Sequence, residues 1–207
     1  FIINIIVLNN RLSAEVNLFP GLFFILISCL IPDFLYLSPV LLGNTFFLLA
    51  ISELYSTYKN PSCADRIFNA GFLIGLSSLF YFPFLFFFIL LFGGLNILRA
   101  YNIREQLIGI SGLIVPYFIL GVAFYWFDHF DFFWDKQFGR NFNFMSFIKD
   151  YYSIEQYLKL AFFALIILVA LLSYDSYMHK KNIQVQKKIS ILYWALGATI
   201  LSIIFQT

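Results

Sequence analysis

Long apolar segments alternate with short polar stretches along the whole chain, a pattern typical of proteins that cross a bilayer several times. A helix needs about 20 residues, at about 1.5 Å each, to cross about 30 Å of hydrocarbon. The pattern therefore predicts an all-α fold, a polytopic transmembrane helical bundle of about seven spans. The predicted elements are the tail of an earlier helix at 1–10 and spans at 16–31, 36–55, two within 67–98, 106–127, 157–178 and 189–205.

The segment 67–98 is too long for one ordinary span and short for two. Tyr81, Phe82 and Pro83 lie near its middle. Proline removes a backbone donor and disfavours a helical conformation in the residue before it. The segment therefore predicts a tight hairpin of two helices.

The placement of lysine and arginine tests this count, because short cytoplasmic loops carry the excess of positive charge. With a hairpin, Arg11 and the connections 57–66, 99–105 and 179–188 share one side, which then holds nine of the 13 cations. With a single span the division would be seven against six. The charges favour the hairpin, with these three connections in the cytoplasm and the aromatic loop 128–156 in the periplasm.

Composition excludes a water-soluble globule. The 207 residues are 61% apolar and only 12% charged, and the mean hydropathy is +0.85, whereas soluble domains average about 45–50% apolar and about 25% charged. A net charge of +2 is too small for a nucleic-acid partner. The 29 phenylalanines suggest an AT-rich bacterial genome, so the predicted location is a bacterial inner membrane, with the bilayer and other membrane-protein subunits as partners.

The chain forms a single predicted transmembrane domain, 1–207. It opens at Phe1, inside an apolar run and without a basic region before it, so we expect it to lack its true N-terminus. Cys29 and Cys63 fall near opposite faces of the predicted bundle and are expected to be free thiols. Glu53 and Asp175 lie within about one turn of the cytoplasmic ends of their spans, where a carboxylate reaches headgroup water.

Loop 128–156 interleaves acids with aromatic residues and supports two interpretations. Asp128, His129 and Asp131 could contribute to a metal or catalytic carboxylate site. Alternatively, a helix would place large aromatic side chains four residues apart on one face at headgroup depth. The aromatic residues of that face are Phe130, Trp134 and Phe138.

Two further features have a structural and a functional interpretation. Asp33 is the only charge in the first outer loop. It could act as a general base at the membrane surface, or it could cap the next helix. Gly71 and Gly75 form a small-xxx-small motif, suited to packing within the bundle or against a partner. The chain has no phosphate-binding glycine loop, nucleophile elbow, HExxH or CxxC motif, so no cofactor is expected.

The segments 17–22 (NLFPGL), 35–46 (LYLSPVLLGNTF) and 67–83 (IFNAGFLIGLSSLFYFP) resemble an uncharacterised family of bacterial inner-membrane proteins. Some members of that family have been misnamed carotene monooxygenases. The resemblance covers most of the chain and implies a longer parent with additional N-terminal spans. It implies no activity, and an iron site of several histidines cannot come from His129 and His179 alone.

More distantly, the chain is similar to multi-spanning glycosyltransferases and polymerases that use lipid-linked sugars. The likeness lies in an outer-loop acid, then an Asn-containing span, then a hairpin with Asn-Ala-Gly-x-x-x-Gly. It implies Asp33 as the acid and Lys136 or Arg140 as the lipid-phosphate contact.

Three functions follow in order of support. The first is a non-catalytic or accessory subunit of a bacterial membrane complex, because the predicted midplane holds few polar groups and the outer loop suits docking. The alternative is a transferase for lipid-linked sugar at the outer face, with Asp33, Asp128 or Asp131 as catalytic residues. The third is a transporter, which rests on the glycine-rich and proline-containing span 106–127 and the short hairpin.

Overall fold

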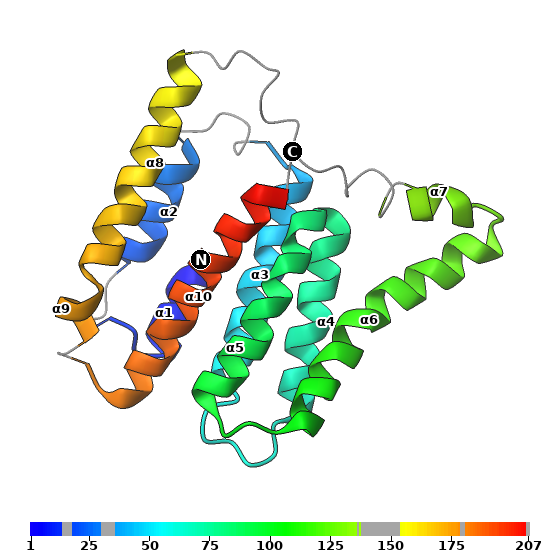
Figure 1. Ribbon diagram of the computed structural model, residues 1–207, viewed down its shortest axis with the longest axis horizontal. Helices are drawn as coiled ribbons and strands as arrows, with labels where there is room; N and C mark the ends of the chain where they lie inside the picture. The colour runs from blue at the N-terminus through cyan, green and yellow to red at the C-terminus, as the bar shows by residue number, and fades with distance from the viewer. Residues whose placement is uncertain (14–17, 30–35, 136, 138–153, 179–180, 206–207) are drawn as a thin grey trace.

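The structure, a computed structural model, describes residues 1–13, 18–29, 36–135, 137, 154–178 and 181–205, and most of these residues are helical (Figure 1). No β-strand occurs among these residues, which confirms the predicted all-α class. The described elements are α1 (Ile2–Asn9), α2 (Phe19–Cys29), α3 (Pro39–Tyr55), α4 (Ala64–Phe80), η2 (Phe82–Phe87), α5 (Phe88–Leu98), α6 (Ile103–Trp126), α7 (Phe130–Trp134), α8 (Ile154–Leu172), α9 (Tyr174–Met178) and α10 (Ile183–Phe205).

The predicted hairpin within 67–98 is confirmed. The chain leaves the helical conformation at Tyr81, whose φ of −149° and ψ of 104° are extended. Pro83 then sits in the first turn of the 3-10 helix η2, where its missing N–H costs no hydrogen bond. The helix α4 and the η2–α5 segment run antiparallel beside each other (Figure 1), so the α3–α4 and α5–α6 connections lie at the same end of the bundle.

Hydropathy located the helices better than it located their ends. The predicted span 36–55 becomes α3, which begins at Pro39 because the Ser38 hydroxyl accepts a hydrogen bond from the Leu41 amide at 3.2 Å. The last helix begins at Ile183, six residues before the expected span 189–205. Its first turns are rich in Gln and Lys, which favour a helix as readily as apolar residues do.

The core lies between α3, α4, α5 and α10. Three phenylalanine rings pack together where α3 meets η2: Phe47 lies 4.1 Å from Phe87 and 5.8 Å from Phe84 between ring centroids. Ile67 of α4 and Ile191 of α10 are fully buried. Side chains from helices more than a hundred residues apart in sequence thus share one apolar interior.

The helices α4 and α6 approach each other through glycine on both sides. A Cβ on Gly71 would lie 2.2 Å from the carbonyl oxygen of Gly109, and one on Gly112 would lie 2.3 Å from that of Phe68. A Cβ on Gly75 would lie 2.6 Å from the carbonyl oxygen of Leu113. The small-xxx-small motif therefore packs within this chain, where only glycine permits the two backbones to come so close.

Among the described helices, α6 alone is both long and apolar enough to cross a bilayer, at 24 residues. The other apolar helices are shorter: α2 has 11 residues and α3 has 17, or about 25 Å at 1.5 Å per residue. The seven predicted spans overlap described helices, with 157–178 divided between α8 and α9, but of these helices α6 is the one that is both long and apolar enough to cross a bilayer.

We expect Gly71→Ala to destabilise the protein by about 1–3 kcal/mol, because the added methyl group overlaps a backbone oxygen that cannot rotate away. The matched control is Gly121→Ala on α6, whose new Cβ would meet its nearest atom, on Phe130, at 4.0 Å. That change should be neutral or stabilising, because alanine favours a helix over glycine by roughly 0.5–1 kcal/mol. Thermal unfolding in detergent measures both, and equal melting temperatures would refute the close α4–α6 contact.

Candidate functional site

Four connections of the chain meet at one end of the bundle, the lower end in Figure 1, which we call the basic end. The α3–α4 and α5–α6 connections lie there, together with the residues after α1 and the start of α10. Hydrogen bonds across this end join segments that are up to 178 residues apart in sequence. The described cations of this end are Arg11, Lys59, Arg66, Arg99, Arg104, Lys181, Lys187 and Lys188.

Arg99 ties the α3–α4 connection to the α5–α6 connection. Its guanidinium donates hydrogen bonds to the carbonyl oxygens of Thr57 and Asn60 and contacts the Cys63 sulfur. Its other terminal nitrogen lies 3.1 Å from a carboxylate oxygen of Glu105. A planar guanidinium can direct several donors at once, which the single ammonium of lysine cannot do in the same geometry.

The start of α10 is anchored to α1 and α3. The Lys188 ammonium donates to the side-chain oxygen of Asn10 at 2.7 Å, and the Tyr55 hydroxyl donates to the Lys188 carbonyl oxygen at 3.0 Å. Lys188 is 5% exposed. In the sequence, Lys188 does not differ from the other three lysines of the connection 179–188. Its role could not be predicted, because no local pattern indicates a partner 178 residues away.

Cys63 is buried at this end, while Cys29 is exposed at the end of α2. Both thiols are free, as expected. Burial raises the pKa of the Cys63 thiol, and the nearby Arg99 guanidinium opposes part of that shift. At neutral pH the Cys63 side chain is therefore a protonated thiol and a poor nucleophile.

Glu53, one of the two carboxylates expected near the membrane surface, pairs with Arg66 at 2.9 Å. The pair joins the last turn of α3 to the first turn of α4, and half of the Arg66 side chain is exposed. Glu53 thus forms an ion pair at the surface of the basic end. The side chain of Asp175 lies outside the described residues.

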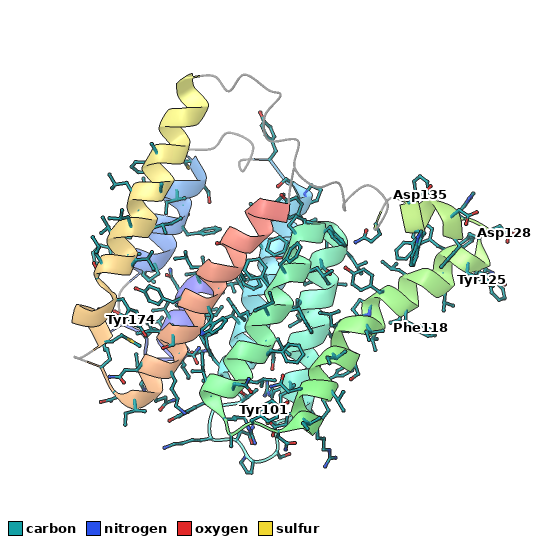
Figure 2. The ribbon with its side chains drawn as sticks, in the orientation of Figure 1. Tyr101, Phe118, Tyr125, Asp128, Asp135 and Tyr174 are labelled. Carbon is teal, nitrogen blue, oxygen red and sulfur yellow. The ribbon has the colours of Figure 1, made fainter. Side chains whose placement is uncertain are left out.

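The predicted outer loop 128–156 begins with a sharp reversal between α6 and α7. Asp128 follows the end of α6 with a φ of 55°, a left-handed conformation that aspartate tolerates better than most residues. Figure 2 shows Asp128 and Asp135 at the far tip of the α6–α7 pair, well away from Tyr174. Asp128, Asp131 and Asp135 are all exposed.

Aromatic side chains hold α7 against α6. Phe133 is buried and stacks on Phe124 of α6, with ring centroids 5.3 Å apart. Phe130 and Trp134 stack on each other at 6.4 Å and stay 41% and 55% exposed. The aromatic face predicted from the four-residue spacing thus begins at Phe130 and Trp134, while Phe138 lies outside the described residues.

The described acids do not converge on a common point. Over the described part of the chain, no group of three His, Cys, Asp or Glu side chains is placed to hold a metal ion. Asp33, the third candidate catalytic residue, lies outside the described residues, so Asp128 and Asp131 are the two that can be placed. Both stand on an exposed tip, without the enclosure that a catalytic carboxylate uses to exclude water.

The tip continues a broad exposed surface along α6. The helix packs on α4 along one side, and most of its other side chains are exposed. We call the exposed apolar side chains of the second half of α6, together with those of α7, the α6–α7 edge. Its members are Phe118, Ile119, Val122, Tyr125, Trp126, Phe130, Phe132 and Trp134, which are 41% to 82% exposed.

An apolar cavity of about 510 Å³ lies at the opposite end of the bundle from the basic end. It is bounded by the last turns of α2, the first turns of α3, η2 and Thr199 of α10. Four of its twelve described lining residues are phenylalanines, and Asn44 supplies an amide. Cavities of this size and character suit the apolar part of a ligand.

Comparison with known proteins adds no family assignment: the chain matches no protein-family model, no curated protein and no solved structure. The resemblance to a family of bacterial inner-membrane proteins therefore stays a prediction.

We expect Arg99→Met to lower the free energy of unfolding by about 2 kcal/mol, because buried carbonyl groups and Glu105 lose a charged partner. Arg104→Met is the matched control, since Arg104 is exposed and its side chain makes no ion pair among the described residues. Denaturation of both purified variants in detergent measures the difference. Equal stability of the two variants would show that Arg99 does not hold the connections together.

Proposed function

We propose that this protein is a multi-pass protein of a bacterial inner membrane and a non-catalytic or accessory subunit of a membrane complex. In this proposal the basic end faces the cytoplasm, and the α6–α7 edge reaches the periplasmic surface. The chain contributes an apolar helical bundle and a docking edge, while the chemistry of the complex belongs to other subunits.

Two properties support the membrane location. Large apolar side chains are exposed on the outside of α2, α6 and α8. Together they form an apolar surface that would be unusually large for a protein in water. The described cations concentrate at one end, as the positive-inside rule requires of cytoplasmic connections. Helices shorter than the hydrocarbon thickness are accommodated by local thinning of the bilayer and by flanking residues that reach the interface.

The α6–α7 edge is the observation that carries the accessory role. It combines exposed aromatic rings with three exposed acids, and aromatic residues are enriched at protein interfaces. The acids lie on the outside of the tip and do not enclose a substrate. A surface of this kind favours binding of a partner subunit at headgroup depth over catalysis by this chain.

One observation favours the alternative, a transferase that uses a lipid-linked sugar. The apolar cavity beside η2 could accept the hydrocarbon part of such a lipid at the end of the bundle that the proposal places outside. The first experiment on partners therefore also has to identify bound lipids.

The two native cysteines test the orientation. In spheroplasts, a membrane-impermeant maleimide should label Cys29, because this thiol is exposed at the periplasmic end of α2. It should leave Cys63 unlabelled until the protein is denatured, since this thiol is buried and its pKa is raised by burial. Labelling is read by mass spectrometry of the Cys63→Ser and Cys29→Ser single-cysteine variants.

The matched control introduces Ser62→Cys in the Cys29→Ser background. Ser62 is an exposed neighbour of Cys63 in the α3–α4 connection. This cysteine should react only in inverted vesicles. Reaction of Cys29 only in inverted vesicles, or of the Ser62→Cys thiol in spheroplasts, would refute the proposed orientation.

The docking role is tested by purification of the tagged protein in mild detergent, followed by mass spectrometry of co-purifying chains and lipids. We expect stoichiometric partner subunits with the wild-type protein and a several-fold loss of them with Tyr125→Ser. Tyr101→Ser is the matched control, because Tyr101 is 68% exposed against 72% for Tyr125 and lies toward the basic end (Figure 2).

Equal loss of partners in both tyrosine variants would refute the α6–α7 edge as the docking surface. A wild-type protein that purifies alone and carries a polyprenyl-linked sugar would refute the accessory role and favour the transferase.

A further inference from the structure

We infer that the basic end contains a binding site for a phosphate group. The site is a polar cavity of about 350 Å³ between the residues after α1 and the start of α10. Arg11 and Lys181 supply its charge, and Asn9, Asn182 and Gln184 supply amide groups. Among the described residues, no acidic side chain lines it. Two cations and several neutral donors around one polar cavity have the chemistry of an anion site.

The cations of the basic end fall into two groups, and this division is what points to a ligand. On the side of α3 to α6, Arg66 pairs with Glu53 and Arg99 with Glu105. On the side of the cavity, Arg11 and Lys181 make no ion pair with any described residue. The Lys181 ammonium lies 5.1 Å from the centroid of the Tyr177 ring, a contact that leaves its charge unneutralised. The first group is thus paired with carboxylates, whereas the second group has no carboxylate partner among the described residues.

The walls of the cavity are held in place by contacts that do not consume its charged groups. Asn10 uses its amide nitrogen on the Ile6 carbonyl oxygen at 2.8 Å and its amide oxygen on Lys188 at 2.7 Å. The Tyr177 hydroxyl donates to the Leu12 carbonyl oxygen at 3.0 Å. Residues 10–12 are thus held against α9 and α10 without a ligand, so binding need not order these segments.

The start of α10 adds a favourable field. The first turn of this 23-residue helix contains no acid, so the positive end of its dipole is not offset by its own side chains. Asn182, directly before this turn, and Gln184 within it line the same cavity as Arg11. The field reinforces the side chains and does not define the site alone.

A phosphate at this position has two sources. One is the headgroup of an anionic lipid such as phosphatidylglycerol, because the cavity lies at the end of the bundle where cytoplasmic headgroups are expected. The other is a free phosphate or a phosphorylated solute from the cytoplasm. The recognition chemistry is the same, so the two sources are distinguished by experiment.

The test uses the full chain purified in a zwitterionic detergent, with two probes measured separately. Native mass spectrometry counts bound phosphatidylglycerol, with phosphatidylcholine as the reference lipid, and titration with inorganic phosphate is followed by the melting temperature. We expect Arg11→Gln and Lys181→Gln each to weaken binding of the effective probe roughly tenfold, whereas Lys181→Arg should retain it. Arg104→Gln, the matched control, should bind as the wild type does.

Selective loss of phosphatidylglycerol in the two glutamine variants would assign the site to a lipid headgroup. Loss of the phosphate-dependent rise in melting temperature alone would assign it to a soluble phosphate. Wild-type binding of both probes by Arg11→Gln and Lys181→Gln, or no binding of either probe by the wild type, would overturn the site. Because the isolated chain is used, that failure would leave the accessory role intact.

Discussion

The close approach of α4 to its two neighbours is the constraint on which the arrangement of the bundle depends. On one side the α4 and α6 backbones meet through glycines, and on the other the Ser77 hydroxyl donates to the Gly43 carbonyl oxygen of α3 at 2.8 Å. In the proposed bilayer setting, where lipid removes the hydrophobic driving force between helices, such short contacts and hydrogen bonds supply the association. The position of α4 then sets where α6 leaves the bundle and where the α6–α7 edge lies.

Polar groups are concentrated at the basic end, where their hydrogen bonds and ion pairs join segments that are far apart in sequence. Arg99 joins two connections, and Lys188 joins α10 to α1. The largely buried charges of Arg99 and Lys188 are matched with carbonyl, amide or carboxylate oxygens, because an unmatched charge in an apolar protein would be costly. This end therefore anchors the bundle and contains the proposed phosphate site, and only the second of these depends on cations without a carboxylate partner among the described residues.

The distribution of chemistry over the molecule is uneven, and this limits the kinds of function that fit. The exposed acids occupy the tip of α6 and α7, the paired acids occupy the basic end, and an apolar cavity lies beside η2. No described acid lines that cavity, and no three described His, Cys, Asp or Glu side chains are placed to hold a metal ion. An accessory subunit requires none of these groups to converge, whereas a transferase would require Asp33 to complete a site at the cavity.

Local sequence was sufficient to predict the helical class, the hairpin around Tyr81 and Pro83, and the end at which the cations gather. Hydropathy, a missing amide proton and charge counts are properties of neighbouring residues, so they can be read without a fold. Helix ends were less well predicted, because Ser38 caps α3 by a single hydrogen bond. The partner of Gly71, the contacts of Arg99 and the cavity between Arg11 and Lys181 required the folded chain. Each of these joins residues that are far apart in sequence, and a pattern along the chain contains no information on which distant segments pack together.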